Sequence, residues 1–157
     1  MANKPLVVTG FIFWLIATGM FLAAMLTKFW KSLLQQAFHF NLFENCVSSV
    51  CVQAGWDPSS VGLAMFVPRI LMLVAAFFIL LGVVIGLVGL CSDRNKCCMV
   101  AEGVLTIVGG IVALCACAVY TGLNHNSFIN FGYSFYFGWV SGVGYIVAGA
   151  LHAAGSK

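Results

Sequence analysis

Four long stretches of this chain carry almost no charge, and each is long enough to cross a lipid bilayer as a helix. They run over residues 6–27, 66–90, 100–121 and 133–153, and the acidic residue within them is Glu102. A helix rises about 1.5 Å per residue, so about 20 apolar residues span the roughly 30 Å of a bilayer's hydrocarbon core. The sequence therefore predicts four transmembrane helices.

The scarcity of charge excludes several other classes of protein. Hydrophobic residues make up 62% of the chain and charged residues 7%, whereas a soluble domain typically has about 25% charged residues. An ordinary cytosolic enzyme, a disordered chain and a nucleic-acid-binding protein are thereby excluded, the last because it needs a basic face. The first apolar stretch is also longer than the core of a cleaved signal peptide. We expect a single four-span membrane domain over residues 1–157, with loops at 28–65 and 122–132.

An even number of spans places both ends of the chain on one side of the membrane. If that side is the cytosol, the positive-inside rule is met by a small margin, because four basic residues then lie inside and three outside. The inner ones are Lys4, Arg94, Lys96 and Lys157, and the outer ones are Lys28, Lys31 and Arg69. We therefore expect cytosolic termini and extracellular first and third loops.

The seven cysteines fit this orientation. Cys46 and Cys51 lie in the long outer loop, where an oxidising compartment lets a disulfide persist, with two free thiols as the alternative. Cys91, Cys97 and Cys98 lie beside the membrane on the cytosolic side, a common setting for S-palmitoylation, with unmodified thiols as the alternative. The remaining two cysteines lie in the third span, where we expect them to be small packing residues.

The long outer loop has the pattern of β-strands. Over residues 38–43 every second position carries an aromatic or aliphatic side chain, since Phe38, Phe40 and Leu42 alternate with His39, Asn41 and Phe43. Val50 and Val52 flank Cys51 in the same way. Period-two alternation among aromatic and β-branched residues is typical of strands. A bond from Cys46 to Cys51 would close a tight, hairpin-like loop and contribute roughly 2 kcal/mol. We expect a small antiparallel sheet that caps the helices.

Glycines at four-residue spacing indicate where helices touch. Lipid does not drive helices together, so close packing depends on small side chains. The second span has Gly82 and Gly86, and the fourth has Gly138 and Gly142. These pairs fit packing within one molecule, with a seam between two copies of the chain as the alternative.

The residue types offer little for catalysis. Glu102 lies about one turn inside the third span, where we expect it to pair with Lys96 or to reach the interface, with a proton relay as the alternative. Arg69 is expected to anchor the outer loop, with Glu44 as its candidate partner. The histidines lie in separate loops or in the tail, without the spacing of metal ligands: His39, His125 and His152. We therefore expect no catalytic, cofactor-binding or metal-binding residues, and a protein that is not an enzyme.

Four landmarks follow one another along the chain. Trp30 follows the first span, and Leu42 and Phe43 precede the two loop cysteines. Arg69 stands at the start of the second span. The later landmarks are Ala-Val-Tyr-Thr at 118–121 and an aromatic-rich run at 131–140. In this order they resemble the claudin, peripheral myelin protein and epithelial membrane protein superfamily. The short spacing of the two cysteines is most similar to its lens fibre membrane intrinsic protein branch.

The resemblance implies a fold class and a role. The fold is all-α transmembrane, a left-handed four-helix bundle with a small extracellular antiparallel β-sheet in the first loop. The role is that of a non-enzymatic plasma-membrane protein that acts in cell–cell contact or membrane organisation through its extracellular loops. Its partners would be the lipid bilayer and either further copies of itself or another membrane protein, and not nucleic acid. Two alternatives stay open: an accessory or trafficking subunit, including one of a granule or vesicle membrane, and a paracellular pore, which the few loop charges disfavour.

Overall fold

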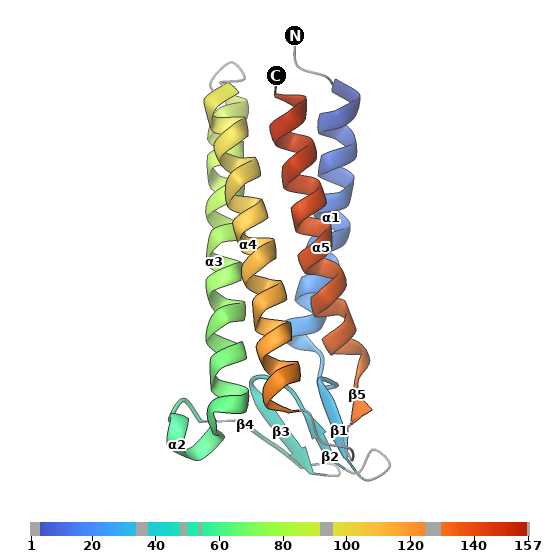
Figure 1. Ribbon diagram of the computed structural model, residues 1–157, viewed down its shortest axis with the longest axis vertical. Coiled ribbons are helices and arrows are strands. Elements are labelled where there is room, and N and C mark those ends of the chain that lie inside the picture. Colours follow the sequence, from blue (N-terminus) through green and yellow to red (C-terminus); the bar gives the residue numbers. More distant parts are fainter. Residues whose placement is uncertain are drawn as a thin grey trace.

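Four long helices stand side by side, with a small sheet at one end and the start of the first and the end of the last helix at the other (Figure 1). The computed structural model describes residues 4–33, 38–47, 50–53, 55–91, 96–124 and 130–156. The long helices are α1 (Lys4–Leu26), α3 (Leu63–Cys91), α4 (Lys96–Leu123) and α5 (Tyr133–Gly155). All four are long and apolar enough to cross a bilayer, as the sequence predicts.

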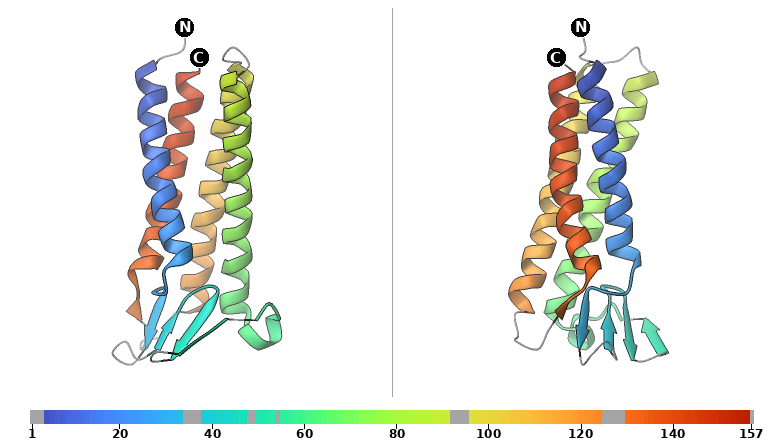
Figure 2. Two further views of the ribbon diagram at one scale, coloured as in Figure 1. Left: turned by 180° about the vertical axis from the view of Figure 1, so that it is seen from behind. Right: turned by 90° about the vertical axis from the view of Figure 1, so that its right-hand side faces the viewer.

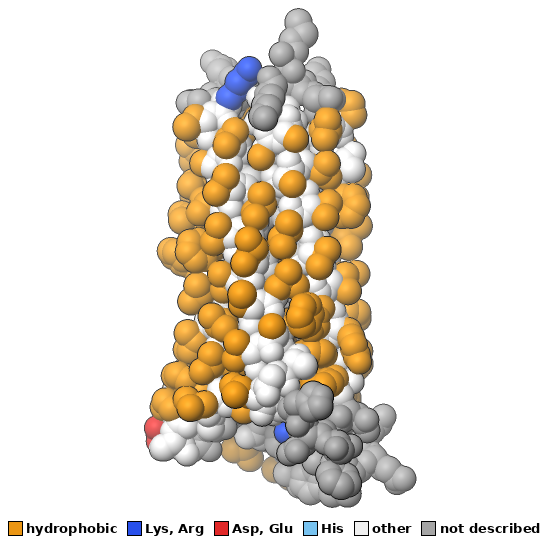
Figure 3. Space-filling model, viewed as in Figure 1, with side chains coloured by type: hydrophobic (Ala, Val, Ile, Leu, Met, Phe, Trp, Pro, Cys, Tyr) orange, Lys and Arg blue, Asp and Glu red, His pale blue; other side chains and the backbone are white. Residues whose placement is uncertain are grey.

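The helices pack in a fixed order. Among the described residues, the extensive contacts join α1 to α5, α5 to α4 and α4 to α3. Seen from behind, α1 and α3 lie nearest the viewer (Figure 2). Hydrophobic side chains cover the outer face of the helices along most of their length (Figure 3). This surface suits contact with lipid, because a water-facing protein does not expose so continuous an apolar belt.

The sheet has five antiparallel strands in the order β4-β3-β2-β1-β5. The strands are β1 (Lys31–Leu33), β2 (Phe38–Phe40), β3 (Glu44–Val47), β4 (Val50–Gln53) and β5 (Asn130–Phe131). The expected sheet is thus confirmed, and it is larger than expected, because β5 comes from the segment between α4 and α5. A single short helix, α2 (Pro58–Val61), follows β4, and the side chain of Asp57 caps it by accepting from the N–H of Ser59.

The expected disulfide is present in the β3–β4 hairpin. Cys46 lies directly opposite Cys51 in the strand register, and their sulfurs are bonded. Side chains that face each other across an antiparallel pair are close enough to bond in this way. The two residues that connect these strands, 48 and 49, lie outside the described residues.

The core is centred where the sheet meets the helices. Trp30 is fully buried there, and its ring lies edge-on to Tyr120 and Phe135, with centroids 5.1 Å and 6.0 Å away. The indole N–H of Trp30 donates to the carbonyl of Ala24. This carbonyl belongs to the last turn of α1, where main-chain oxygens have no helical partner. Trp30 therefore both fills the core and closes the end of α1.

Asn124 compensates for a proline in α3. Pro68 lies inside that helix and has no N–H to donate to the carbonyl of Ala64, four residues earlier. The Nδ2 of Asn124 donates to this carbonyl at 3.3 Å, and also to the carbonyl of Tyr120 at 3.0 Å. A buried side chain at the end of α4 thus holds the start of α3.

Helices α4 and α5 approach each other at glycines. A Cβ at Gly110 would lie 2.7 Å from the carbonyl oxygen of Gly142, and a Cβ at Gly138 would lie 2.9 Å from the Sγ of Cys117. The predicted residues of the second span face α4 in the same way. A Cβ at Gly82 would lie 3.3 Å from the Oγ1 of Thr106, and one at Gly86 would lie 2.9 Å from the Cγ of Glu102. The four glycines predicted from the sequence therefore lie against a neighbouring helix of the same molecule: Gly82, Gly86, Gly138 and Gly142.

Candidate interaction site

One cation joins the helices to the sheet. Arg69 is 1% exposed, its Nε donates to the carbonyl of Leu42 at 2.6 Å, and its Nη1 donates to the carbonyl of Gly55 at 2.7 Å. The guanidinium carbon also lies 5.5 Å from the ring centroid of Phe43 and 5.2 Å from that of Trp56. The planar guanidinium presents several donors in fixed directions. One side chain can therefore hold the segment before β3 and the segment after β4 together.

The expected pairing of Arg69 with Glu44 is wrong. The carboxylate of Glu44 pairs instead with Lys28, with 3.3 Å between Oε2 and Nζ, and the side chains of Lys28 and Glu44 are 50% and 40% exposed. Leu42 and Gly55 lie just outside the strands, so their carbonyls lack a ladder partner and require another donor. The buried guanidinium supplies it, whereas the side chain of Glu44 reaches solvent.

Several landmarks of the family resemblance, Trp30, Leu42, Phe43 and Arg69, lie where the sheet meets the helices. We call this region the junction. Leu42 is fully buried, and its N–H bonds at 2.6 Å to the Oδ1 of Asn41. The Nδ2 of Asn41 donates to a carbonyl in the last turn of α1. Trp30, Leu42 and Phe43 belong to one buried cluster, and Arg69 contacts the latter two.

The segment that leads into α5 and the first turn of this helix are tied to the same end of α1. The N–H of Gly132 donates to the carbonyl of Trp30 at 3.1 Å. The Oγ of Ser134 lies 2.6 Å from the Oγ1 of Thr27 and accepts from the N–H of Phe29 at 3.2 Å. The sequence does not predict these contacts, because residues this far apart in the chain leave no local pattern.

Apolar side chains are exposed on β4 and just beyond it. Val50 and Val52 on β4 are 65% and 64% exposed, and Trp56 beyond it is 57% exposed. We call these three residues the β4 surface. In the described sheet β4 is an edge strand, so one row of its main-chain groups has no strand partner. Edge strands commonly carry charged side chains that prevent pairing with another chain, but Val50–Gln53 has none.

Glu44, Cys46 and Cys51 place potential ligand atoms within 4.8 Å of one another. A metal would require thiolates, and the two sulfurs are joined as a disulfide. The cluster therefore serves as a cross-link of the hairpin in this form of the protein.

The predicted acylation sites lie at the opposite end of the molecule. Cys97 is exposed and Cys98 is half-buried, and both stand in the first turn of α4. The side chain of Cys91 lies outside the described ones. Of the two cysteines in the third span, Cys115 is exposed and Cys117 is buried.

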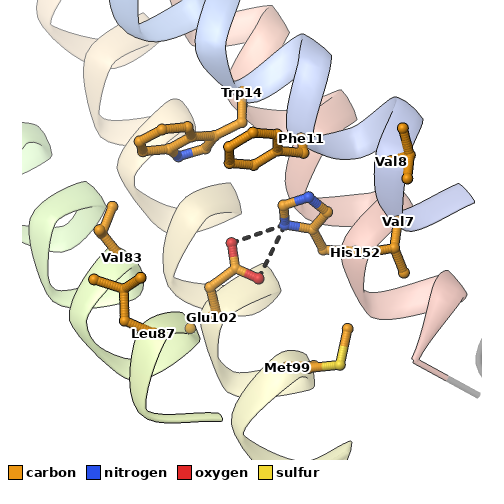
Figure 4. Close-up of a pocket in the computed structure, with 10 residues that line it drawn as sticks. Val7, Val8, Phe11, Trp14, Val83, Leu87, Met99, Glu102 and His152 are labelled. Atoms are coloured by element: carbon orange, nitrogen blue, oxygen red, sulfur yellow. Dashed lines mark hydrogen bonds and ion pairs between the residues drawn. The ribbon is translucent and has the colours of Figure 1, made fainter. Parts of the chain in front are cut away.

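Glu102 and His152 form a buried polar pair that was not predicted from the sequence. The Nδ1 of His152 lies 2.8 Å and 2.9 Å from the two carboxylate oxygens of Glu102 (Figure 4). The two side chains are 8% and 12% exposed. The expectations that Glu102 meets Lys96 or the interface, and that His152 belongs to the tail, are therefore wrong. A signal did exist, since a carboxylate inside a span needs a polar partner and His152 lies near the same end of another span.

Comparison with known proteins agrees with this architecture. The model of the PMP-22/EMP/MP20/Claudin family matches residues 4–152, which include the sheet, its disulfide and almost all of the four long helices. A comparison with curated proteins finds no match. Since the family match extends over nearly the whole chain, this four-span membrane protein belongs to the PMP-22/EMP/MP20/Claudin family.

Proposed function

We propose that this protein organises cell contacts or membrane domains by binding further copies of itself through its sheet end. The observation that carries the proposal is the β4 surface, where Val50 and Val52 stand exposed on an edge strand that bears no charge and Trp56 is exposed just beyond it. Membership of a non-enzymatic membrane family supports a binding role rather than a catalytic one.

In this proposal the sheet end faces the cell exterior. The disulfide between Cys46 and Cys51 favours this orientation, because such bonds persist in oxidising compartments and are rare in the cytosol. Lys4 and Lys96 lie at the start of α1 and α4, at the opposite end, where basic residues favour the cytosolic side. In the proposal the protein lies in the plasma membrane with its termini in the cytosol.

A second copy of the chain is the partner that best matches the β4 surface. Two identical edge strands can pair antiparallel about a two-fold axis, and each then satisfies the unpaired main-chain groups of the other. No like charges oppose this pairing on Val50–Gln53. The apolar side chains of Val50 and Val52 would leave water at the same time, which adds a hydrophobic contribution.

The experiment compares two double variants in the full-length protein. Val50→Lys with Val52→Lys places like charges on the edge strand, and Val50→Ile with Val52→Ile keeps it apolar and β-branched. We expect the lysine variant to lose oligomers in mild detergent and the isoleucine variant to keep them. The Cys46–Cys51 bond, tested by thiol labelling before and after reduction, must stay intact in both variants for the comparison to report on association.

A second measurement relates association to cell contact. Non-adherent cells that express the protein are mixed with cells that carry it under a different label. Enrichment of both labels where cells touch, with its loss in the lysine variant, supports contact formation. If both variants associate equally, or if one other membrane protein co-purifies in fixed ratio with no self-association, an accessory subunit is the better description.

A further inference from the structure

A crevice opens between α1 and α3 near the end that carries the chain termini. Its volume is about 370 Å³, within the range of about 300–1,000 Å³ that is typical of small-molecule sites. Its walls are apolar side chains of α1 and α3, among them Phe11, Trp14 and Val83 (Figure 4). Phe11 is half-exposed on the outer surface of the helices, so the crevice is open to lipid from the side.

The inner side of the crevice is formed by the Glu102–His152 pair, which comes from α4 and α5. A carboxylate can accept about four hydrogen bonds, and the described side chains supply it with the Nδ1 of His152. The Nε2 of His152 is buried and has no hydrogen-bond partner among the described residues. Polar atoms at this depth of a membrane protein require partners. The Nε2 lies against Gly10 of α1, so the unused capacity for a ligand belongs to the carboxylate of Glu102.

Two glycines make room for this pair. A Cβ at Gly86 of α3 would lie 2.9 Å from the Cγ of Glu102, and a Cβ at Gly10 of α1 would lie 2.4 Å from the Cδ2 of His152. The carboxylate and the imidazole thus occupy space that any larger residue would take. The pair is built into the helix contacts on both sides of the crevice.

The depth of these groups matches the layout of a lipid. Glu102 lies six residues after the start of α4, which places it about 9 Å along the helix. Trp14 lies ten residues after the start of α1, or about 15 Å along it. Since Gly10 of α1 lies against His152, Phe11 is almost level with the polar pair, and Trp14 lies about 6 Å further along α1 from this end of the helices.

We propose that this crevice binds a sterol, with the sterol hydroxyl on the Glu102–His152 pair and the ring system against Phe11 and Trp14. A hydroxyl both donates and accepts, so it suits the pair whether the imidazole carries one proton or two. The rings of Phe11 and Trp14 are stacked at 12°, with centroids 6.1 Å apart, and present a flat wall to a rigid body. The site is at the opposite end of the helices from the β4 surface and does not depend on the proposed function.

The test uses full-length protein in vesicles that contain a photoreactive sterol with a free hydroxyl. We expect cross-links on α1 near Phe11 and Trp14 and on α3 near Val83. Unlabelled sterol should compete, whereas the matching 3-ketone, which cannot donate a hydrogen bond, should compete about tenfold less well. This comparison uses the unaltered protein, so it does not depend on whether a variant folds.

Matched variants locate the site. Val83→Trp fills the crevice and should reduce labelling about tenfold, whereas Val84→Trp, on the neighbouring exposed position, should leave it unchanged. Glu102→Leu, which removes the acceptor oxygens, should remove the preference for the hydroxyl over the ketone. Equal competition by the ketone, better competition by a diacylglycerol or a single-chain amine, or equal labelling of the two tryptophan variants would overturn the proposal.

Discussion

The Nε of Arg69 donates a 2.6 Å hydrogen bond to the main-chain carbonyl of Leu42. The carbonyl of Leu42 lies outside the strands and has no neighbouring strand to donate to it. The side chain of Arg69, at the start of α3, supplies the donor instead. The same guanidinium reaches Gly55, so one residue fixes both flanks of the β3–β4 hairpin. The position of the sheet on the helices therefore depends on the geometry of an arginine side chain and not only on its charge.

Arg69→Lys should destabilise the sheet end although it keeps the charge. A lysine ammonium cannot reproduce the two directed bonds, and each hydrogen bond to a charged group contributes about 1.5–3 kcal/mol. We expect a lower thermal midpoint in detergent and less protein at the cell surface, measured by surface biotinylation. Lys28→Ala is the control, because the exposed Lys28–Glu44 pair contributes at most about 1 kcal/mol. Equal effects of the two changes would contradict the anchoring role.

Removal of the disulfide should loosen the hairpin and spare the helices. In Cys46→Ser with Cys51→Ser, the short loop loses a constraint that contributes roughly 2 kcal/mol. Hydrogen exchange measured by mass spectrometry should become faster in β3 and β4. Peptides from the middle of α4 and α5 should exchange as before, since their contacts lie elsewhere. Faster exchange throughout the helices would show that the disulfide stabilises the whole fold.

Gly132→Ala should impair folding, whereas Gly122→Ala should not. A Cβ at Gly132 would lie 1.9 Å from the carbonyl oxygen of Phe29, and this oxygen is main chain and cannot turn away. A Cβ at Gly122 meets no atom within 4 Å. The yield of monodisperse protein in detergent is the measurement, and similar yields from the two variants would rule out this close approach.

Gly10→Ala and Gly19→Ala should change stability in opposite directions. Both glycines lie in α1, and within a helix alanine is more stable than glycine by roughly 0.5–1 kcal/mol. At Gly19 the added Cβ meets no atom within 4 Å, so the thermal midpoint should hold or rise. At Gly10 the Cβ displaces the imidazole of His152, and such overpacking typically costs about 1–3 kcal/mol. A midpoint for Gly10→Ala as high as that for Gly19→Ala would contradict the burial of His152 against α1.

Cys97 and Cys98 should carry thioester-linked acyl chains if their end of the molecule is cytosolic. They stand in the first turn of α4, where an acyl chain can enter the bilayer beside the helix. Hydroxylamine-dependent acyl exchange should fall in Cys97→Ser with Cys98→Ser. The buried Cys117 gives the control, since Cys117→Ser should leave the signal unchanged. Persistence of the full signal in the double variant would assign the acyl chain to another cysteine, and the lack of a signal in the unaltered protein would contradict acylation altogether.

The sequence predicted those parts of the fold that a local pattern records. Hydropathy located all four helices, and alternation located β2 and β4, because burial in lipid or against a sheet face acts on successive residues. The starts of the helices were less well predicted. α4 begins at Lys96, ahead of the expected 100, since a helix continues into the head-group layer where a charge is tolerated.

The parts that could not be predicted are those that depend on distant pairing. β5 has two residues, too few to show a period, and it forms a strand only because β1 lies beside it. His152 and Glu102 are 50 residues apart, and their meeting depends on the rotation of two helices. The partner of Arg69 was misjudged for a related reason. Every residue has a main-chain carbonyl, so the sequence does not indicate which ones Arg69 contacts, whereas Glu44 is recognisable as a charged residue.

The contact between the sheet and the helices also has a consequence for the order in which the molecule is assembled. Thr27 and Ser134, which bond there, are separated by 107 residues, and Phe135 completes the ring contacts of Trp30. A ribosome delivers the first loop long before it delivers the last helix. Until that helix is inserted, Trp30 lacks Phe135 as a neighbour and Thr27 lacks Ser134. The junction is therefore completed only when the last helix has joined the molecule.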